Sequence, residues 1–387
     1  MAEHVEYIVI GLGALGSATA AALARAGHSV VGLERFALGH ERGASHDTSR
    51  IPRHSYVTPH YVGLTFDAYD DWAELERASG EDLVSVVGGL DLFPRDASIS
   101  MSDYTASMAV WGVPYEELTS AAIRERWPQL RVDDDTHGLF QERAAIVPAA
   151  RGTAAMQRQA LQHGAVLRDM SEVNALRDLG AGGVEVLTSD VTYRARRVVL
   201  CADAWTNKLL AGVGWELPLT VLQEQVTYFG VDDPPRYAPG ALPLWMWMDD
   251  PSYYGFPCYG ESSIKAARSC GGPVVTGDQR SFEPDPALVE QLQRFCQGLL
   301  PGITSPLRSK TCLYTLTPDR DFVLSPVPGH ESVLVGLGAA HGFKFAPTFG
   351  RMLAELAETE ETSYDVHPFR LDRPALVDPD YAVNWLV

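Results

Sequence analysis

Residues 7–35, YIVIGLGALGSATAAALARAGHSVVGLER, decide the fold of this chain. They predict a buried strand, a tight glycine turn, an alanine-rich helix and a second strand that ends at Glu34. Gly11, Gly13 and Gly16 have the G-x-G-x-x-G spacing, which permits the tight turn, the approach of a pyrophosphate to the backbone and close packing of the helix. The start of the helix then offers free N–H groups and partial positive charge to phosphates.

Glu34 narrows the choice of ligand. An acid at the end of the second strand accepts hydrogen bonds from a ribose diol and repels a 2′-phosphate. The motif therefore predicts a site for NAD or FAD. The alternative is that the glycines serve only the packing of strand against helix, with nothing bound.

Two later segments return to this nucleotide-binding unit. Each predicts a strand, a turn of small residues and a helix: residues 195–210, ARRVVLCADAWTNKLL, and residues 332–358, SVLVGLGAAHGFKFAPTFGRMLAELAE. Residues 164–195 alternate in polarity around Gly-rich turns and predict a meander of antiparallel strands. With residues 332–358, three segments contribute to the nucleotide-binding unit. A third segment is useful for a long cofactor whose second half must also be bound, which favours FAD over NAD.

The remaining residues predict a second domain. Segments 83–146 and 218–317 are rich in short strands and aromatic residues. They interrupt a nucleotide-binding domain that we expect to comprise residues 1–82, 147–217 and 318–387. The expected fold is α/β (α+β), in which a Rossmann-like FAD-binding domain is interleaved with a mostly antiparallel β-sheet substrate domain. Because ligand sites favour domain junctions, the second domain is expected to cover the reactive half of the cofactor.

The composition disfavours several other classes of protein. The chain of 387 residues is 46% hydrophobic and 21% charged, which is typical of a globular protein. Its net charge of −19 disfavours nucleic acid and anionic membranes as partners. Its five cysteines contain no C-x-x-C pair, so neither a disulfide framework nor a metal site is expected. Without a visible export signal or an apolar run of about 18 residues, we expect a cytoplasmic protein.

Six short motifs together resemble one known family over nearly the whole chain. They are GLGALG (11–16), SHDTSRIPRHSY (45–56), ADAWTNKLL (202–210), YYGFP (253–257) with a lysine eleven residues after its second tyrosine, TCLYTLTPD (311–319) and AAHGFKF (339–345). The set resembles the FAD-dependent monomeric sarcosine oxidases and N-methyltryptophan oxidases of the D-amino-acid-oxidase-like superfamily. The resemblance implies a monomeric oxidase with FAD as its cofactor.

The resemblance also assigns the residues that hold the cofactor. It implies that the flavin is attached covalently through Cys312, with Arg50 against the ring favouring the attachment. A thiolate can add to the 8α-methyl carbon of an oxidised flavin, and nearby cations assist such an attack. The alternative for Cys312 is a small buried hydrophobic residue. His46, Val173, His341 and Lys344 are likewise assigned to the cofactor site, although His46 is equally well explained as a core or loop residue.

Four residues are assigned to the substrate and to oxygen. An amino acid must place its carboxylate in a dry pocket, where an unpaired charge is costly. The resemblance gives this carboxylate to Arg53 and Lys344, with Tyr254 as a phenolic donor or wall. Lys265 is implied to activate oxygen, because a positive charge stabilises the anion that forms first. The alternatives are a surface position for Arg53 and a solvated sheet-edge position for Lys265.

The implied reaction is oxidation of the C–N bond of a secondary amino acid, either N-methylated or cyclic, with oxygen reduced to hydrogen peroxide. The expected partners are therefore this small molecule and oxygen, without nucleic acid or a membrane. One alternative is a flavin- or NAD-dependent dehydrogenase that uses another electron acceptor. The other is a non-catalytic nucleotide-binding protein.

Three positions depart from the family pattern and leave the substrate open. Ser269 replaces a histidine four residues after the oxygen-activating lysine, and Ala340 replaces a glycine before His341. Trp245 stands where sarcosine oxidases have a methionine, and Trp247 should project to the same face of that strand. Either this face lines the pocket and changes its bulk, or both tryptophans pack in a sheet core.

Overall fold

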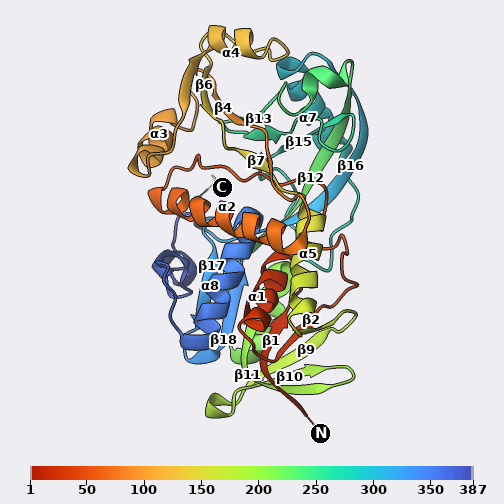
Figure 1. Cartoon of the computed structure of the whole chain (residues 1–387), viewed down its shortest axis with the longest axis vertical. Helices are drawn as coiled ribbons and strands as arrows, with labels where there is room; N and C mark the ends of the chain where they lie inside the picture. Colours follow the sequence, from red (N-terminus) through yellow and green to blue (C-terminus); the bar gives the residue numbers. More distant parts are fainter. Residues whose placement is uncertain (1, 385–387) are drawn as a thin grey trace.

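Two large sheets organise the molecule. The computed structural model describes residues 2–384. Figure 1 shows one sheet in the lower half of the molecule and the other in the upper half. The lower sheet is largely parallel and the upper one largely antiparallel, which confirms the expected α/β (α+β) class.

The lower sheet contains the glycine motif. Its strands follow the order β17 (Val323–Val327), β18 (His330–Leu337), β11 (Thr192–Leu200), β1 (Glu3–Ile10), β2 (Val30–Leu33) and β8 (Val166–Arg168). From β18 to β8 all neighbours are parallel, and β10 (Val184–Thr188) and β9 (Val173–Asp178) extend β11 as the predicted antiparallel meander. All of β2 and the last four residues of β1 are buried, as expected for a parallel sheet covered on both faces.

Helices pack closely on this sheet. α1 (Ala14–Arg25) lies against α8 (Ala346–Thr359) and α5 (Ala149–Gln162). A Cβ atom at Gly350 would overlap the Cβ atom of Ala18, so small residues allow α1 and α8 to approach each other. α2 (Pro59–Ser79) crosses between the two halves of the molecule (Figure 1). Two short helices complete this half, α6 (Thr206–Leu210) and α9 (Pro374–Val377).

The upper sheet is antiparallel except where β13 meets β4. Its strands follow the order β16 (Ile303–Leu316), β12 (Thr220–Val231), β15 (Ser263–Arg268), β14 (Tyr253–Gly255), β13 (Leu244–Trp247), β4 (Gly89–Phe93), β6 (His137–Gln141) and β5 (Glu116–Thr119). Three helices accompany it, α3 (Met101–Val110), α4 (Ser120–Arg126) and α7 (Pro286–Leu299). A separate pair joins β3 (Ser85–Val86) to β7 (Ala145–Ile146).

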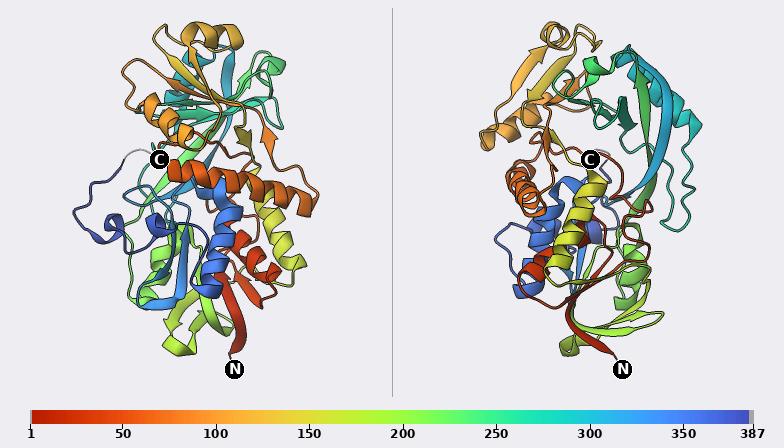
Figure 2. Two further views of the ribbon diagram at one scale, coloured as in Figure 1. Left: turned by 60° about the vertical axis from the view of Figure 1, so that its left-hand side comes forward. Right: turned by 45° about the vertical axis from the view of Figure 1, so that its right-hand side comes forward.

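The two sheets draw on alternating parts of the chain. Residues 3–33, 166–200 and 323–337 supply the lower sheet, whereas residues 89–141 and 220–316 supply the upper one. The long paired strands β12 and β16 run from the upper half towards the lower one (Figure 2). On this basis we propose two domains that divide at the expected boundaries, after residues 82, 146, 217 and 317.

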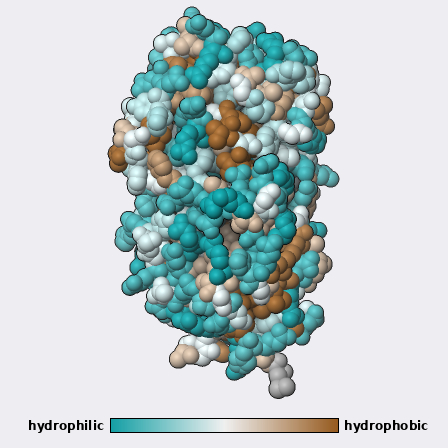
Figure 3. All heavy atoms as spheres, viewed as in Figure 1, coloured by the Kyte–Doolittle hydropathy of each residue, from teal (hydrophilic) through white to brown (hydrophobic). Residues whose placement is uncertain are grey.

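The surface is largely hydrophilic, with scattered apolar patches on the face that Figure 3 shows. Within residues 2–384, no helix is both long enough and apolar enough to cross a membrane. All five cysteines are free. The same residues contain no group of three or more His, Cys, Asp or Glu side chains arranged to hold a metal ion.

Candidate active site

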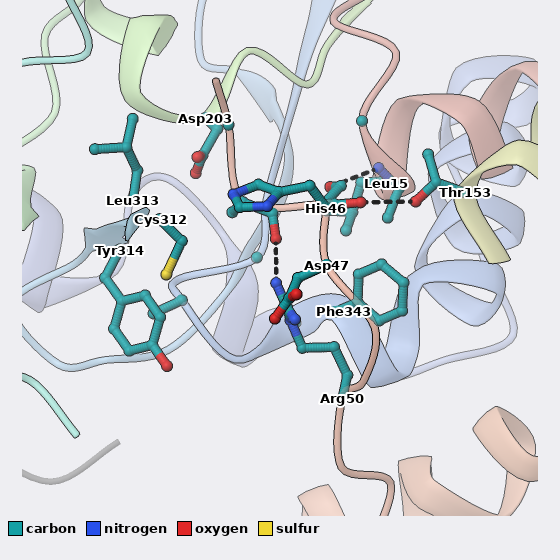
Figure 4. A pocket seen from close by; sticks show the side chains of 18 of the residues that line it. Leu15, His46, Asp47, Arg50, Thr153, Asp203, Cys312, Leu313, Tyr314 and Phe343 are labelled. Atoms are coloured by element: carbon teal, nitrogen blue, oxygen red, sulfur yellow. Dashed lines mark hydrogen bonds between the residues drawn. The ribbon is translucent and has the colours of Figure 1, made fainter. Parts of the chain in front are cut away.

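A cavity of about 330 Å³ lies between the two sheets and is lined by residues of both. It reaches from the glycine turn after β1 to the turn before α8. Every residue predicted for the site lines it except Gly16. Figure 4 shows His46, Arg50, Asp203 and Cys312 around this space, although they come from three separate segments of the chain.

The glycine turn permits close approach of the backbone to a ligand. Gly11 has a φ of 88°, in the left-handed region, and a Cβ atom there would overlap the carbonyl oxygen of Cys201. A Cβ atom at Gly16 would overlap the carbonyl oxygen of Gly11, so Gly16 serves packing beneath the turn. Gly13 is the N-cap of α1 and offers no side chain to cap it. The N-terminus of α1 therefore borders the cavity in a form that suits an anion.

Glu34 directly follows β2, and backbone groups hold its carboxylate. The N–H of Leu12 donates to Oε2 at 2.9 Å, and the N–H of Phe36 donates to Oε1 at 3.0 Å. Burial raises the pKa of Glu34, but hydrogen bonds from His40 and from these two N–H groups outweigh it and leave the pKa below its ordinary value. The carboxylate is therefore charged at neutral pH, and its remaining lone pairs fit ribose hydroxyl groups.

Several polar side chains on the cavity wall have buried atoms without a partner in the described chain, and His46 and Asp203 are two of them. Both ring nitrogens of His46 and Oδ2 of Asp203 bond to nothing within residues 2–384. Such an atom costs about 1–3 kcal/mol when it stays unsatisfied, so these side chains fit a ligand that brings its own donors and acceptors. Together with the glycine turn and Glu34, they fit a dinucleotide such as FAD.

Asp203 is absent from the residues that the sequence predicts for the site. It comes soon after β11, its φ is 47°, and burial raises its pKa to about 6. Ligands in α/β folds gather at the carboxyl ends of parallel strands. A polar residue at that end of a predicted strand is therefore the signal that identifies Asp203.

Cys312 lies on β16 and is buried at the cavity wall. Burial raises the pKa of its thiol to about 11, although Arg50 and Lys265 lower it. The guanidinium of Arg50 donates to the carbonyl oxygens of Ser49 and Ala44 at 2.8 Å each, which holds it beside the cavity (Figure 4). The thiol is therefore protonated here, with cations nearby.

Arg53 is not on the surface, because its side chain is only 12% exposed. Nη1 donates to Oδ1 of Asp91 at 3.1 Å and to Oγ of Ser55 at 3.2 Å. Burial raises the pKa of Asp91, although Arg53 lowers it. Asp91 is also absent from the residues that the sequence predicts for the site. The feature that could have identified it is the presence of an acid within the apolar strand β4, GLDLF.

Lys344 and His341 lie in the turn before α8. Nζ of Lys344 donates to the carbonyl oxygen of His341 at 2.9 Å. Burial, Arg53 and Arg50 together hold the pKa of Lys344 well below its usual value. Nε2 of His341 lies 3.0 Å from the carbonyl oxygen of Arg320, and burial lowers the pKa of this histidine to about 3. A neutral ring that donates from Nε2 leaves Nδ1 as an acceptor.

Lys265 lies on β15 between β12 and β14, so it is not at a sheet edge. Its Nζ forms an ion pair with Oδ2 of Asp47 at 2.6 Å and donates to the carbonyl oxygen and to Oγ of Ser49 at 3.1 Å each. Burial and Arg50 lower the pKa of Lys265 to about 8, although Asp47 raises it.

Other predicted residues also border the cavity. The hydroxyl groups of Tyr254 and Tyr314 lie 3.4 Å apart, and burial raises the pKa of both phenols, so both stay protonated. Val173, at the start of β9, is buried and lines the cavity. Ser269 and Ala340, two of the departures from the family pattern, line it as well.

The two tryptophans of β13 do not line the cavity. Trp245 is fully buried in the core of the upper half, where both Trp245 and Trp247 contact Phe295 of α7. Met246 and Met248 line the cavity instead. Of the two alternatives left open by the sequence, packing in a sheet core is therefore correct and a tryptophan-lined pocket is wrong.

The chain is similar to known enzymes over almost its full length. It is 34% identical to a monomeric sarcosine oxidase of Streptomyces avermitilis, over 95% of this chain and 97% of that one. It is 30% identical to the N-methyl-L-tryptophan oxidase of Escherichia coli, over 95% of this chain and 99% of that one. Among solved structures, NikD, an unusual amino acid oxidase essential for nikkomycin biosynthesis, matches with a TM-score of 0.86 and 27% identity, over 95% of this chain and 97% of NikD.

One family profile covers most of the chain. It is described as FAD dependent oxidoreductase and matches residues 6–356. This span contains the glycine turn, Glu34 and the unpartnered ring of His46, which fit the cofactor that the description names. Both the profile and the relatives show that the chain belongs to the FAD dependent oxidoreductase family.

Proposed function

We propose that this chain oxidises the C–N bond of a secondary amino acid, N-methylated or cyclic, and passes the electrons to oxygen to give hydrogen peroxide. The observation that supports this best is the pattern of charge in the cavity. Arg53 is paired with Asp91 and Lys265 with Asp47, whereas Lys344 has no acidic partner within the described residues. A half-buried lysine without a counter-ion fits a substrate that brings its own carboxylate.

FAD, when bound, supplies a two-electron acceptor for the carbon next to nitrogen. The adenosine and pyrophosphate half of FAD would be held by the glycine turn (Gly11, Gly13 and Gly16), Glu34 and Val173. The flavin half would be held by His46, Arg50 and His341. The unpartnered nitrogens of His46 and the free acceptor on His341 support these assignments.

Lys344 and Arg53 bind the substrate carboxylate. An anion in the cavity stabilises the ammonium form of Lys344, which burial and two arginines disfavour in its absence. Substrate binding therefore favours the charged form of Lys344. Arg53 contributes its remaining N–H donors, since only Nη1 is engaged by Asp91 and Ser55.

The amine binds in its neutral form, so the chain needs no strong base beside it. The hydroxyl groups of Tyr254 and Tyr314 stay protonated and act as donors or as a wall. Met246 and Met248 add apolar surface that keeps water away from the reacting carbon. The ammonium of Lys265 stabilises the negative charge that develops as oxygen is reduced.

Cys312 attaches the cofactor covalently in this proposal. Cys312 would supply the sulfur for a thioether to the flavin, in a step that needs its thiolate. The buried thiol must lose its proton in this step. Arg50 and Lys265 assist because both cations favour the thiolate.

We also propose a monomer, which the names of relatives such as the monomeric sarcosine oxidase of Streptomyces avermitilis support. Location in the cytoplasm stays a prediction.

A peroxide-coupled screen of N-methyl amino acids and cyclic imino acids tests the function. We expect at least one secondary amino acid to yield peroxide in step with oxygen uptake, and the corresponding amine without a carboxylate to react far more slowly. Reduction of the flavin without peroxide in air would instead identify a dehydrogenase with another acceptor. No flavin reduction by any of these compounds would contradict the proposed substrate class.

A further inference from the structure

Asp47 is a buried acid that the function proposed above does not use directly. It lies in the segment before α2, and its side chain and that of Lys265 are each only 4% exposed where Oδ2 and Nζ form their ion pair at 2.6 Å. Removing one member of such a desolvated pair leaves an uncompensated charge on the other. The state of Lys265 therefore depends on Asp47.

The backbone at Asp47 is in an unfavourable conformation. Its φ is 82°, in the left-handed region that glycine adopts freely. For another residue such a conformation costs about 1–3 kcal/mol and persists where the surroundings require it. Glycine would remove the strain but also the carboxylate, so the presence of an acid points to a role for its charge.

Tyr228 holds the second oxygen of this carboxylate. Its hydroxyl donates to Oδ1 of Asp47 at 2.7 Å and lies 2.8 Å from Oγ1 of Thr48. Arg308 is the residue of β16 paired with Tyr228 of β12, and its guanidinium lies 3.8 Å from the centre of the Tyr228 ring and covers that ring. Asp47 is thus fixed in the orientation that faces Lys265.

The other groups around Lys265 do not replace Asp47. Burial lowers the pKa of Lys265 most, and the guanidinium of Arg50 lowers it further. Asp47 is the strongest group that raises it, ahead of Cys312. The ring of Tyr228 is 5.9 Å from Nζ and contributes only a weak cation–π attraction. Burial raises the pKa of Asp47 itself, but Lys265 and Tyr228 bring it to about 2, so the acid stays ionised at neutral pH.

We propose that Asp47 is a positioning residue that keeps the ammonium of Lys265 charged and fixed at the cavity wall, with Tyr228 as its anchor. The inference rests on the proposed function, in which this ammonium assists the reduction of oxygen. A consequence is that the reaction with oxygen slows at high pH as Lys265 loses its proton, and that Asp47 sets the pH at which this loss occurs.

The first experiment measures the charge of Lys265 without any turnover. The chain has only four lysines, Lys208, Lys265, Lys310 and Lys344, so ¹³C at lysine Cε gives four NMR signals. The signal that Lys265→Met removes is titrated in the holoenzyme. Asp47→Asn is expected to lower this pKa by about one unit or more. Asp47→Gly should lower the Lys265 pKa by the same amount while removing the backbone strain at residue 47. Tyr228→Phe should lower the Lys265 pKa by less. Asp91→Asn is the matched control, because it removes a buried acid that does not pair with Lys265.

The second experiment follows the reaction of the anaerobically photoreduced holoenzyme with oxygen across pH. The rate should fall as Lys265 loses its proton, and Asp47→Asn should move this fall to lower pH by the shift that NMR records. An unchanged Lys265 pKa in both Asp47 variants overturns the proposal. A lowered pKa with an unchanged oxygen profile keeps Asp47 as the counter-ion but overturns the role of Lys265 in oxygen reduction. If neither Asp47 variant folds, the Tyr228→Phe variant provides the test. An unchanged Lys265 pKa in this variant overturns the proposal that Tyr228 anchors Asp47, and a lowered Lys265 pKa supports it.

Discussion

The guanidinium of Arg53, which lines the cavity, forms an ion pair with the carboxylate of Asp91 behind it, with Nη1 and Oδ1 3.1 Å apart and side chains 12% and 5% exposed. Arg53 is also one of the two groups that we assign to the substrate carboxylate. Asp91 and the substrate would therefore share one guanidinium through different N–H groups. The pair links the affinity for substrate to the stability of the fold, because breaking it leaves a buried charge unpaired.

Replacing Arg53 should separate these two effects. Arg53→Met is expected to raise KM by about 10- to 100-fold, which corresponds to the loss of a charged hydrogen bond, and to leave the flavin bound. It should also lower the free energy of unfolding by about 3–5 kcal/mol, because Asp91 loses its partner. Steady-state kinetics and urea unfolding measure the two quantities.

The double variant Arg53→Met with Asp91→Leu is the control. It should recover most of the lost stability, because no charge remains buried, yet keep the raised KM. Recovery of KM along with stability would show that Arg53 acts only through the fold. An unchanged KM in the single variant would remove Arg53 from the carboxylate site.

Lys265→Met should affect oxygen far more than substrate. Loss of one preorganised charge at the reacting centre is expected to slow flavin reoxidation by about 10²- to 10³-fold. Anaerobic reduction of the flavin by substrate should change little and serves as the internal control. Stopped-flow absorbance follows both half-reactions, and equal slowing of the two would reject the assignment.

Cys312→Ser should release the cofactor. After acid precipitation, the yellow colour of the original protein is expected in the pellet, because a thioether survives denaturation. In Cys312→Ser the colour should move to the supernatant as free FAD. Cys258→Ser, which changes a buried cysteine that does not line the cavity, should keep the colour in the pellet. Free FAD from the original protein would rule out the covalent link.

His46 should make stability depend on pH. Burial and Arg50 lower its pKa from 6.5 to about 4 in the folded chain. Below pH 6.5 the unfolded chain takes up a proton that the folded chain refuses until about pH 4, so this residue makes the protein less stable as the pH falls through that window. The slope is at most about 1.4 kcal/mol per pH unit.

His46→Gln should therefore flatten the pH dependence of the unfolding free energy between about pH 6.5 and 4. Urea unfolding at fixed pH steps measures it. The exposed His163→Gln is the matched control, because its side chain meets water before and after unfolding. The same slope in His46→Gln and the original protein would show that His46 is not held neutral by its surroundings.

The sequence alone determined the nucleotide-binding unit and the chemical inventory of the site. The glycine spacing, the strand periodicity and the acid at position 34 are local patterns, and local sterics and hydrogen bonding decide the structure that they form. The family resemblance then located Cys312, Lys265, Arg53 and Lys344, because short motifs keep their spacing from one relative to another.

Only the tertiary structure decided which of these charges meet and what they face. Alternation along β13 gives two faces, but the packing of α7 decides that Trp245 turns to the core and Met246 to the cavity. Asp47 meets Lys265 across more than two hundred residues of chain. Such pairs depend on how the two sheets close around the cavity, and no local pattern encodes that arrangement.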